Sequence, residues 1–303
     1  MFSFLKKKKL LVTHSGKFHA DDIFSCATLE LVLEQQGYRT EVIRTRDEAI
    51  MARADFVFDV GGEYDHERGR YDHHQRGGAG EHENGIPYAA FGLIWKHYGD
   101  ILTGNTEVTQ HIANKLVQPI DADDNGVQIY ECVRPDVAPR TLQSMLYVFR
   151  PTWCEGMSDA LYDERFRELV DLAKKILARE IKVCTDTAPV CNMIRAVYEA
   201  TEDKRILELH EEYPWEPFID EYDGIIYVIY ERSNTWRVQG VATSKGSYVL
   251  RKRFPENWAG LRDQELVEVS GVPDALFCHN ARFLAVAKSL EGARALAKKA
   301  LEA

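Results

Sequence analysis

The feature that most constrains the fold of this chain is a set of four clusters of histidine and aspartate, each placed where an apolar segment ends. The most unusual cluster is the triplet Asp72-His73-His74, and the others lie in residues 13–22, 56–62 and 119–126. Imidazole and carboxylate together suit Mn²⁺, Fe²⁺, Zn²⁺ or Mg²⁺, and the clusters contain no cysteine, which argues against a closed thiolate zinc site. We therefore interpret the four clusters as one site that holds two divalent metal ions.

The spacing of apolar residues predicts a parallel α/β sheet in the N-terminal half. Short apolar runs at 10–12, 41–44 and 56–58 are typical of buried strands, and the segments between them have helical character. Ligands of such sheets bind beyond the carboxyl ends of the strands. His14 follows the first predicted strand and Asp59 follows the third, so this fold would bring two of the clusters together.

The rest of the chain predicts a loop, further helices and a second, smaller α/β domain. Residues 63–87 form a polar, glycine-rich loop that carries the triplet. Helices are expected at 88–98, at 106–120, where Pro119 would bend or end the helix, and at 158–183. Beyond these, the patterns predict strands at 194–198, 225–230, 236–241 and 248–250 and helices at 263–270 and 290–301. We expect a metal-binding catalytic domain over 1–157, a connector helix over 158–187 and a substrate-binding domain over 188–303.

Composition excludes some classes of function and makes others less favoured. No run of apolar residues approaches the length of a membrane-spanning helix. Six scattered cysteines without framework spacing fit a reducing, cytoplasmic setting. The net charge of −10 gives no indication of nucleic-acid binding by the chain as a whole. An acidic enzyme can nevertheless hold a short RNA in a local basic groove with bound metal. The sequence leaves the oligomeric state open.

The clusters suggest specific roles for their members. One metal would take His14, His19 and Asp59, and Asp59 would bridge to the other. The second metal would take Asp21, Asp59, His73 and one of Asp121 or Asp124. Two metals so placed can clamp a phosphoryl group and generate hydroxide at neutral pH. Among the remaining residues, His74 would protonate the leaving oxygen and Asp72 would orient a histidine, whereas His66, His82 and His97 are expected to be surface or packing residues.

These motifs resemble the DHH phosphoesterase superfamily, and within it the Myg branch, the melanocyte proliferating gene family. The resemblance spans nearly the whole chain. It rests on His14-x4-His19-x-Asp21, on Asp59-Val60-Gly61-Gly62, on Asp72-His73-His74 and on Asp121-Ala122-x-Asp124-Asn125-Gly126, together with Trp236-Arg237-Val238-Gln239 and Phe254-Pro255-Glu256-x-Trp258. It implies a DHH domain with a parallel sheet, a C-terminal α/β lobe that holds substrate in a cleft between the two, and Mn²⁺ or a similar ion. It also implies phosphodiester hydrolysis, since a eukaryotic member is a 3′–5′ RNA exonuclease.

The chain departs from the branch at two places. Asp22 stands where the branch has glutamate. The His-x-x-Gly-Phe stretch of the branch is His279-Asn280-Ala281-Arg282-Phe283 here, and residues 284–288 lack the glycines that follow it. Loss of these glycines would remove a backbone cradle for phosphate, so that either Arg282 or Lys288 replaces it with side-chain charge or the substrate differs.

Basic residues complete the expected site. Arg76 would grip a phosphate or form a surface salt bridge. The residues expected to bind substrate are Arg76, Arg251, Arg253, Arg262, His279 and Arg282. The sequence therefore predicts a two-metal phosphodiester hydrolase, a 3′–5′ exonuclease acting on RNA or short oligonucleotides, with Mn²⁺ favoured over Mg²⁺, Fe²⁺ or Zn²⁺. A small-nucleotide phosphatase or phosphodiesterase and a non-catalytic nucleotide- or metal-binding protein are the alternatives.

Overall fold

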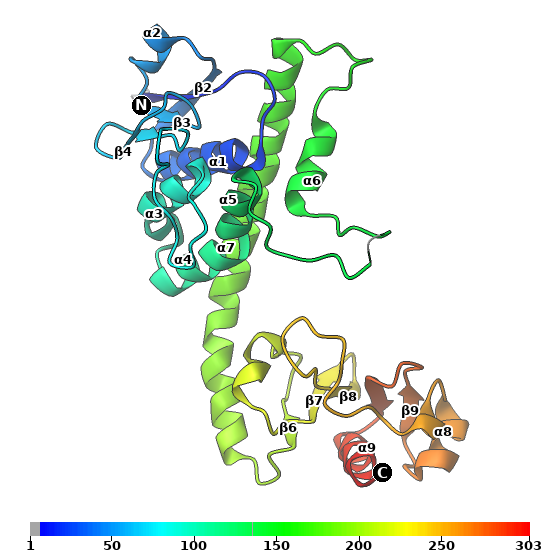
Figure 1. Ribbon diagram of the computed structural model, residues 1–303. Helices are drawn as coiled ribbons and strands as arrows, with labels where there is room; N and C mark the ends of the chain where they lie inside the picture. The colour runs from blue at the N-terminus through cyan, green and yellow to red at the C-terminus, as the bar shows by residue number, and fades with distance from the viewer. Residues whose placement is uncertain (1–6, 135) are drawn as a thin grey trace, which may run out of the picture. The chain divides into compact units, whose positions relative to one another are not determined.

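The computed structural model describes residues 7–134 and 136–303, which form two compact units (Figure 1). The first unit ends at Thr185 and the second runs from Asp186 to Ala303. Each unit contains one five-stranded sheet. Both sheets are mixed, so the predicted α/β class is confirmed. In the first unit the expected parallel sheet is present, but one short edge strand runs antiparallel to it.

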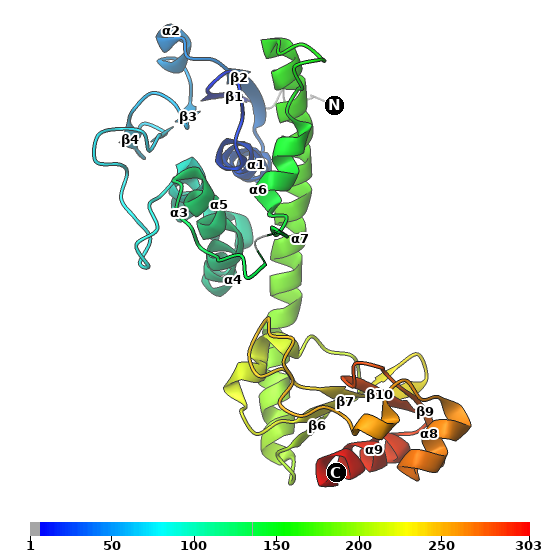
Figure 2. The same cartoon turned by 45° about the vertical axis from the view of Figure 1, so that its right-hand side comes forward.

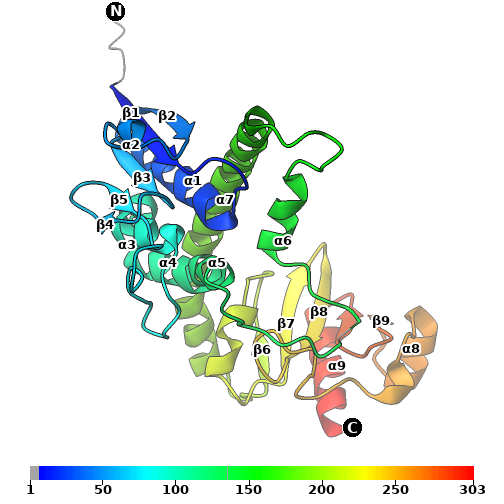
Figure 3. The same cartoon turned by 45° about the horizontal axis from the view of Figure 1, so that its top comes forward.

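The first sheet has the strand order β2-β1-β3-β5-β4 (Figure 3). Strands β1 (Lys8–Thr13), β2 (Arg39–Arg44) and β3 (Phe56–Phe58) are the predicted ones, and β1 pairs in parallel with both neighbours. The segment expected as a loop adds two short strands, β5 (Arg70–Tyr71), parallel to β3, and β4 (Tyr64–Asp65), antiparallel to β5. Two-residue strands are too short to show the alternation by which sequence patterns reveal strands.

Helix α1 (Ala20–Gln35) forms the central contact of the first unit. Its side chains are buried around most of its circumference, which is typical of a helix enclosed by other elements. It packs against α3 (Ala90–Thr103), where the rings of Phe24 and Phe91 lie 5.3 Å apart. Helix α2 (Glu48–Met51) is a single turn capped by the side chain of Asp47. The buried face of α1 therefore fixes the position of its N-terminal residues, His19 to Asp22.

The helix expected to end near Pro119 continues to Asp124, so that prediction is wrong. Helix α4 (Thr106–Ile112) passes into a π-helical turn, η1 (Ala113–Val117), and then into α5 (Gln118–Asp124). The wider π turn leaves Pro119 in the first positions of a new α-helical stretch, where a missing N–H is tolerated. The fourth acidic cluster consequently lies on a helix rather than after one.

A long helix, α7 (Asp159–Ala200), follows a short helix α6 (Leu142–Leu146) and the 3₁₀ turn η2 (Tyr147–Phe149). Its first half packs into the core of the first unit through Phe166, Leu169, Val170, Ala173 and Leu177. Glu30 of α1 accepts hydrogen bonds from Arg167 and Lys174. The predicted connector ended at 187, and residues 194–198, predicted as a strand, belong to this helix instead. A short apolar run does not distinguish a strand from a helix segment.

The second unit has the strand order β6-β7-β8-β10-β9. Figure 2 labels β6, β7, β10 and β9 of this sheet. Strands β7 (Tyr227–Arg232) and β8 (Thr235–Gly240) and helices α8 (Asp263–Ser270) and α9 (Leu290–Glu302) match the predicted segments. Strands β6 (Ile206–Glu208), β9 (Ala275–Cys278) and β10 (Leu284–Ala287) were not predicted. The strand expected at 248–250 is absent from the described structure, where Leu250 forms only an isolated bridge to Ala242. The core includes Tyr227 stacked on Phe254, which stacks on Trp258.

Within residues 7–134 and 136–303, none of the helices combines the length and the apolar character that crossing a membrane requires.

Candidate metal centre

The sheet topology places histidine and aspartate side chains at one edge of the first sheet. His14 directly follows β1, Asp59 follows β3 and Asp72 follows β5. These three strands are parallel and adjacent in the sheet, so their carboxyl ends lie side by side. Helix α1 begins beside this edge with His19 as its N-cap. Four separate chain segments thus meet at this edge of the sheet.

Two carboxylates form the middle of the cluster. Asp59 directs one oxygen to each of two imidazoles: Oδ2 lies 3.0 Å from His14 Nε2 and Oδ1 lies 3.3 Å from His73 Nε2. Asp124 does the same, with Oδ2 at 3.1 Å from His73 Nε2 and Oδ1 at 3.3 Å from His19 Nδ1. A carboxylate whose two oxygens face different imidazoles has the arrangement that a bridging ligand of two metals needs. Asp59 and Asp124 both have this arrangement, and the bridging role of Asp59 stays a prediction.

The buried polar atoms of this cluster fit a divalent cation. Both carboxylate oxygens of Asp21 and of Asp59, and Nε2 of His73, are buried and make no hydrogen bond of acceptable geometry to any described residue. Burying an unpartnered carboxylate is costly. Neighbouring ligands at about 2.1 Å from one ion and about 90° apart are separated by about 3.0 Å, which is the separation seen here. Three groups of these side chains offer ligand atoms that all lie within 4.8 Å of one another: His19 with Asp21 and Asp124, His14 with His19 and Asp59, and Asp59 with Asp72, His73 and His74.

The electrostatics of the site are those of concentrated negative charge. Burial opposes protonation of His14 and His73, but the carboxylates beside them outweigh it and raise the pKa of each imidazole to about 10. Burial, reinforced by repulsion from Asp59 and Asp124, raises the pKa of Asp21 well above its usual range. Burial also opposes ionisation of Asp59, whereas contact with His14 and His73 lowers its pKa overall. Metal cations would offset this charge as the protons on His14 and His73 do in their absence.

The backbone at Asp59 is strained. Its φ of 54° lies in the left-handed region, which non-glycine residues seldom adopt, and Gly61 and Gly62 follow with φ of 102° and 67°. Such conformations cluster at functional sites because the surrounding structure must enforce them. Here the strain turns the Asp59 carboxylate toward His14 and His73.

Asp72 organises the triplet through its hydrogen bonds, and it also offers a ligand atom within 4.8 Å of ligand atoms of Asp59, His73 and His74. Its Oδ1 accepts hydrogen bonds from the backbone N–H groups of His73 and His74, and its Oδ2 accepts one from Gly62. The same Oδ1 lies 2.7 Å from His74 Nδ1. With Nδ1 so engaged, Nε2 is the free nitrogen of His74, whose side chain is 60% exposed. This is the orientation that a proton donor at the open face of the site requires.

The structure separates the two aspartates between which the sequence does not decide. Asp124 lies in the cluster, whereas Asp121, one turn earlier in α5, hydrogen-bonds to His82 at 2.7 Å and accepts the backbone N–H of Gly92. Burial raises the pKa of Asp121 to about 6, although His82 opposes the shift. Asp121 therefore supports the fold of the site, and His82, expected as a surface or packing residue, holds it.

Asp22 is a candidate ligand to which the sequence analysis gave no role. Its Oδ2 is buried and lies 3.2 Å from His14 Nε2, while Oδ1 accepts the N–H of His19. The second of two successive aspartates at a helix start suggests a cap, and Asp22 does serve as one. Only the position of His14 shows that its other oxygen faces the metal cluster.

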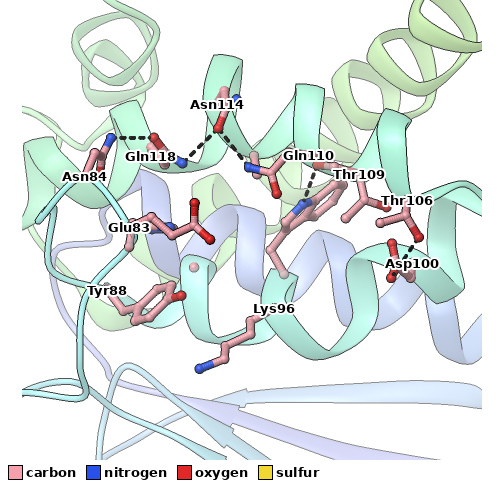
Figure 4. Close-up of a pocket in the computed structure, with 14 residues that line it drawn as sticks. Glu83, Asn84, Tyr88, Lys96, Asp100, Thr106, Thr109, Gln110, Asn114 and Gln118 are labelled. Carbon is pink, nitrogen blue, oxygen red and sulfur yellow. Dashed lines mark hydrogen bonds between the residues drawn. The ribbon is translucent and has the colours of Figure 1, made fainter.

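A pocket of about 790 Å³ lies among α3, α4, η1 and the loop that carries His82 (Figure 4). His82 and Gly92, which hold Asp121, belong to its lining. Figure 4 shows a chain of amide side chains along its upper edge, in which Asn84 donates to Gln118 and both Gln118 and Gln110 donate to Asn114. The amides thus tie the loop that carries His82 to α4, η1 and α5.

The residues expected to bind substrate lie in two places. Arg76 is exposed two residues beyond His74. In the second unit Arg253 donates to Ala281 O, Arg282 donates to Phe254 O, and His279 accepts the N–H of Ala281, so these three surround one turn. Arg262 lies over the ring of Phe277. Arg251 donates to the carbonyls of Tyr222, Ile225 and Ile219, contacts that favour a structural role.

The turn at 279–283 gives a physical reason for the glycine of the Myg branch. Arg282 adopts a φ of 60°, a conformation that glycine reaches without strain. Residues 284–287 form strand β10 rather than a glycine-rich loop. The backbone conformation of the turn therefore accounts for a glycine at position 282 without a phosphate cradle.

Comparison with known proteins shows relatives along nearly the whole chain. Residues 10–301 match the model of the MYG1 exonuclease family, described as an uncharacterised protein family, UPF0160. A MYG1 protein of Caenorhabditis elegans is 34% identical over 97% of this chain and 95% of its own length. The human protein named MYG1 exonuclease is 30% identical over 95% of this chain and 85% of its own length. Among solved structures, RecJ of Thermus thermophilus in complex with Mn²⁺ aligns with 97% of this chain at 13% identity and a TM-score of 0.28, and the chain spans about half of the RecJ chain, 52%.

Proposed function

This chain belongs to the MYG1 exonuclease family, UPF0160, and from that premise we propose that it is a metal-dependent phosphodiester hydrolase that shortens RNA or short oligonucleotides from the 3′ end. The human, bovine and rat relatives carry the name exonuclease. The RNA substrate and the 3′–5′ direction follow from the resemblance of the motifs to the Myg branch.

The observation that carries the proposal is the buried carboxylate of Asp59, whose two oxygens face His14 and His73 without a hydrogen bond of acceptable geometry. We propose that two divalent ions, Mn²⁺ being the favoured one, share Asp59. His14, His19 and Asp22 would complete the ligand set of one ion, and Asp21, His73 and Asp124 would complete that of the other. Carboxylate and imidazole ligands in this mixture suit Mn²⁺ and similar ions.

The side chains of this chain have separate tasks in hydrolysis. When bound, the metal ions would polarise the phosphoryl oxygens and lower the pKa of the attacking water. The oxygen of that water bonds to phosphorus as the bond from phosphorus to the 3′ oxygen breaks. His74, oriented by Asp72 through Nδ1, delivers a proton from Nε2 to the leaving 3′ oxygen, and the proton that the water loses passes to solvent. The products are a shortened strand with a free 3′ hydroxyl and a nucleoside 5′-monophosphate.

A cleavage assay with two substrates tests this function. A 5′-labelled single-stranded RNA and a two-nucleotide RNA are incubated with Mn²⁺ or with chelator, using the wild type and Asp59→Asn. Asparagine tolerates the left-handed backbone of position 59, so the substitution removes charge without releasing the strain. We expect stepwise, metal-dependent shortening that the substitution abolishes. Cleavage of the two-nucleotide substrate alone would instead identify a small-substrate phosphodiesterase, and cleavage of neither would refute the proposal.

We also propose a reducing compartment, the cytoplasm, as its location. All six cysteines are unpaired, and Cys132 and Cys154 are exposed. Exposed thiols persist where the surroundings are reducing. Fractionation of cells tests this proposal, and recovery of the chain with an oxidising compartment would contradict it.

A further inference from the structure

The open face of the metal centre lies between two histidines. The side chain of His19 is 44% exposed and that of His74 is 60% exposed, while the side chains of His14, His73, Asp59 and Asp124 are at most 10% exposed. A substrate must therefore approach past His19 or past His74. The rim beside His19 is formed by the turn η2 and by Arg150, which follows it.

Tyr147 fixes this rim to the metal centre. Its ring lies edge-on to that of His19, with 6.3 Å between the ring centroids. Its hydroxyl donates to Asp123, the neighbour of Asp124, over 3.1 Å. Contacts to residues on both α1 and α5 hold Tyr147 at a defined position next to two of the candidate ligands.

Arg150 carries a positive charge at the same rim. Its guanidinium stacks on the ring of Tyr147, with 3.8 Å between the guanidinium carbon and the ring centroid. Its Nε donates to the backbone carbonyl of Phe18 over 2.9 Å, and its Nη2 donates to the same carbonyl. The third nitrogen, Nη1, has no hydrogen-bond or ion-pair partner among the described residues. The guanidinium is thus anchored next to His19, and no carboxylate of the described chain forms an ion pair with it.

Two exposed aromatic residues lie close to Arg150 in sequence. The side chains of Phe149 and Trp153 are 45% and 83% exposed, an unusual degree for rings of this size. An anchored cation with exposed aromatic rings is the combination by which proteins hold the phosphates and bases of single-stranded nucleic acid.

We propose that residues 147–153 form a strand-binding rim, in which Arg150 holds a phosphate next to the scissile one and Trp153 stacks a base. The inference rests on the proposed function, because it names the part of an oligonucleotide that the site receives. It also explains how a chain of net charge −10 can recruit a polyanion: a guanidinium that forms no ion pair with a described carboxylate stands beside the acidic cluster.

Arg44 offers a matched control. Its Nη2 also donates to a backbone carbonyl near the site, that of Gly16, and its guanidinium lies over the rings of Phe18 and Phe166. Unlike Arg150, it pairs with Asp163 at 3.0 Å, and its side chain is only 3% exposed. Arg44 therefore has the structural contacts of Arg150 without a free, accessible nitrogen.

The test compares two substrates in the Mn²⁺-loaded full chain. One is a 5′-labelled decaribonucleotide, which has neighbouring phosphates and bases, and the other is bis(p-nitrophenyl) phosphate, which has neither. We expect Arg150→Gln and Trp153→Ala each to raise the KM for the decamer about tenfold or more, while the KM for the small diester changes less than twofold. Arg44→Gln should change the kinetic constants for both substrates by the same factor, because it affects only the stability of the fold. Equal effects of Arg150→Gln on both substrates, or no effect on the decamer, would overturn the proposal.

A binding measurement separates this proposal from the proposed function. Fluorescence anisotropy with a phosphorothioate decaribonucleotide and Mn²⁺ reports strand binding without cleavage. If the wild type binds this strand but cuts no RNA, and both rim variants bind about tenfold more weakly, the rim stands and the exonuclease function fails. If the wild type cuts RNA and both variants bind the strand as tightly as it does, the function stands and the rim fails.

Discussion

Asp121 and His82 are joined by a hydrogen bond of 2.7 Å that turns the Asp121 carboxylate away from the metal centre. The second oxygen of Asp121 accepts the N–H of Gly92, so both oxygens are engaged. Asp124, three residues later on the same helix, faces His19 and His73 instead. Helix α5 thus carries a candidate metal ligand, Asp124, at its C-terminal end and a residue that supports the site, Asp121, in its middle.

The two aspartates should respond differently to the same substitution. We expect Asp124→Asn to weaken Mn²⁺ binding at least about tenfold and to abolish hydrolysis, because it removes a charge that faces two imidazoles. Asp121→Asn should leave Mn²⁺ affinity within a few-fold of the wild type and lower the free energy of unfolding by about 1–3 kcal/mol, as expected for a disturbed buried hydrogen bond. Metal titration and thermal melting of both variants measure this, and loss of metal binding in Asp121→Asn would contradict the assignment.

The role of His74 can be tested with the leaving group. We expect His74→Ala to reduce kcat on RNA by about 10²–10⁴-fold, since the 3′ oxygen needs a proton as it leaves. The same variant should retain nearly full activity on a p-nitrophenyl ester of thymidine 5′-phosphate, because nitrophenolate leaves without protonation. Asp72→Asn should also reduce kcat on RNA more than activity on the nitrophenyl ester, but by a smaller factor, because it removes only the ionic contact to His74 Nδ1. An equal loss on both substrates would show that His74 acts in another way.

The metal-free protein should lose stability as pH rises above neutrality. Neighbouring carboxylates raise the pKa of His14 and His73 from 6.5 to about 10, so their stabilising contribution is complete below pH 6.5 and is lost as pH rises toward 10. The raised pKa of Asp21 acts in the same direction. Each 1 kcal/mol lost would lower the Tm by about 2–4 °C.

Melting curves between pH 7 and pH 10, with chelator and with Mn²⁺, measure this dependence. The Tm should fall in chelator and change less with Mn²⁺, since a bound cation replaces the protons. A chelated protein whose Tm is unchanged over this range would contradict the charge assignment.

Gly92 is required for the position of Asp121. A Cβ atom at residue 92 would lie 1.8 Å from Asp121 Oδ2 and 2.8 Å from Tyr88 Cδ1, both impossible contacts. We expect Gly92→Ala to lower the free energy of unfolding by about 1–3 kcal/mol or more, as for an overpacked core. Gly224→Ala is the control, because a Cβ there meets its nearest neighbour at an ordinary 3.7 Å. Denaturant unfolding measures the free energy of unfolding of both variants. Similar values for the two would show that Asp121 can move aside without loss of stability.

Arg282→Gly should stabilise the second unit. Arg282 has a φ of 60°, which costs a residue with a Cβ about 1–2 kcal/mol relative to glycine. Part of this gain is offset by the flexibility of glycine in the unfolded chain and by the lost hydrogen bond to Phe254 O. We expect a net gain of about 0.5 kcal/mol, visible as a raised Tm, whereas Arg282→Ala should give none. A loss of stability in the glycine variant would indicate that the Arg282 side chain outweighs the backbone strain.

The chemistry of the metal site is predictable from sequence because it depends on residue type and on strand ends. Apolar runs mark β1 and β3, and a parallel sheet necessarily gathers the residues that follow its strands. His14 and Asp59 could be assigned to one place on that basis, whereas the triplet was expected in a loop. The patterns fail where they are too short to be distinctive: residues 194–198 lie in a helix, and β4 and β5 lie in a predicted loop.

Tertiary contacts decided what residue type could not. Asp121 and Asp124 are chemically identical and three residues apart, so only the positions of His82 and Gly92 show which of them faces the metal site. Arg150 lies 131 positions beyond His19 in the chain, and no local pattern connects the two; its bond to the Phe18 carbonyl exists only in the folded chain. Residue types and strand order thus determined which chemistry the candidate site can offer, whereas long-range packing determined which of several equivalent groups belong to it.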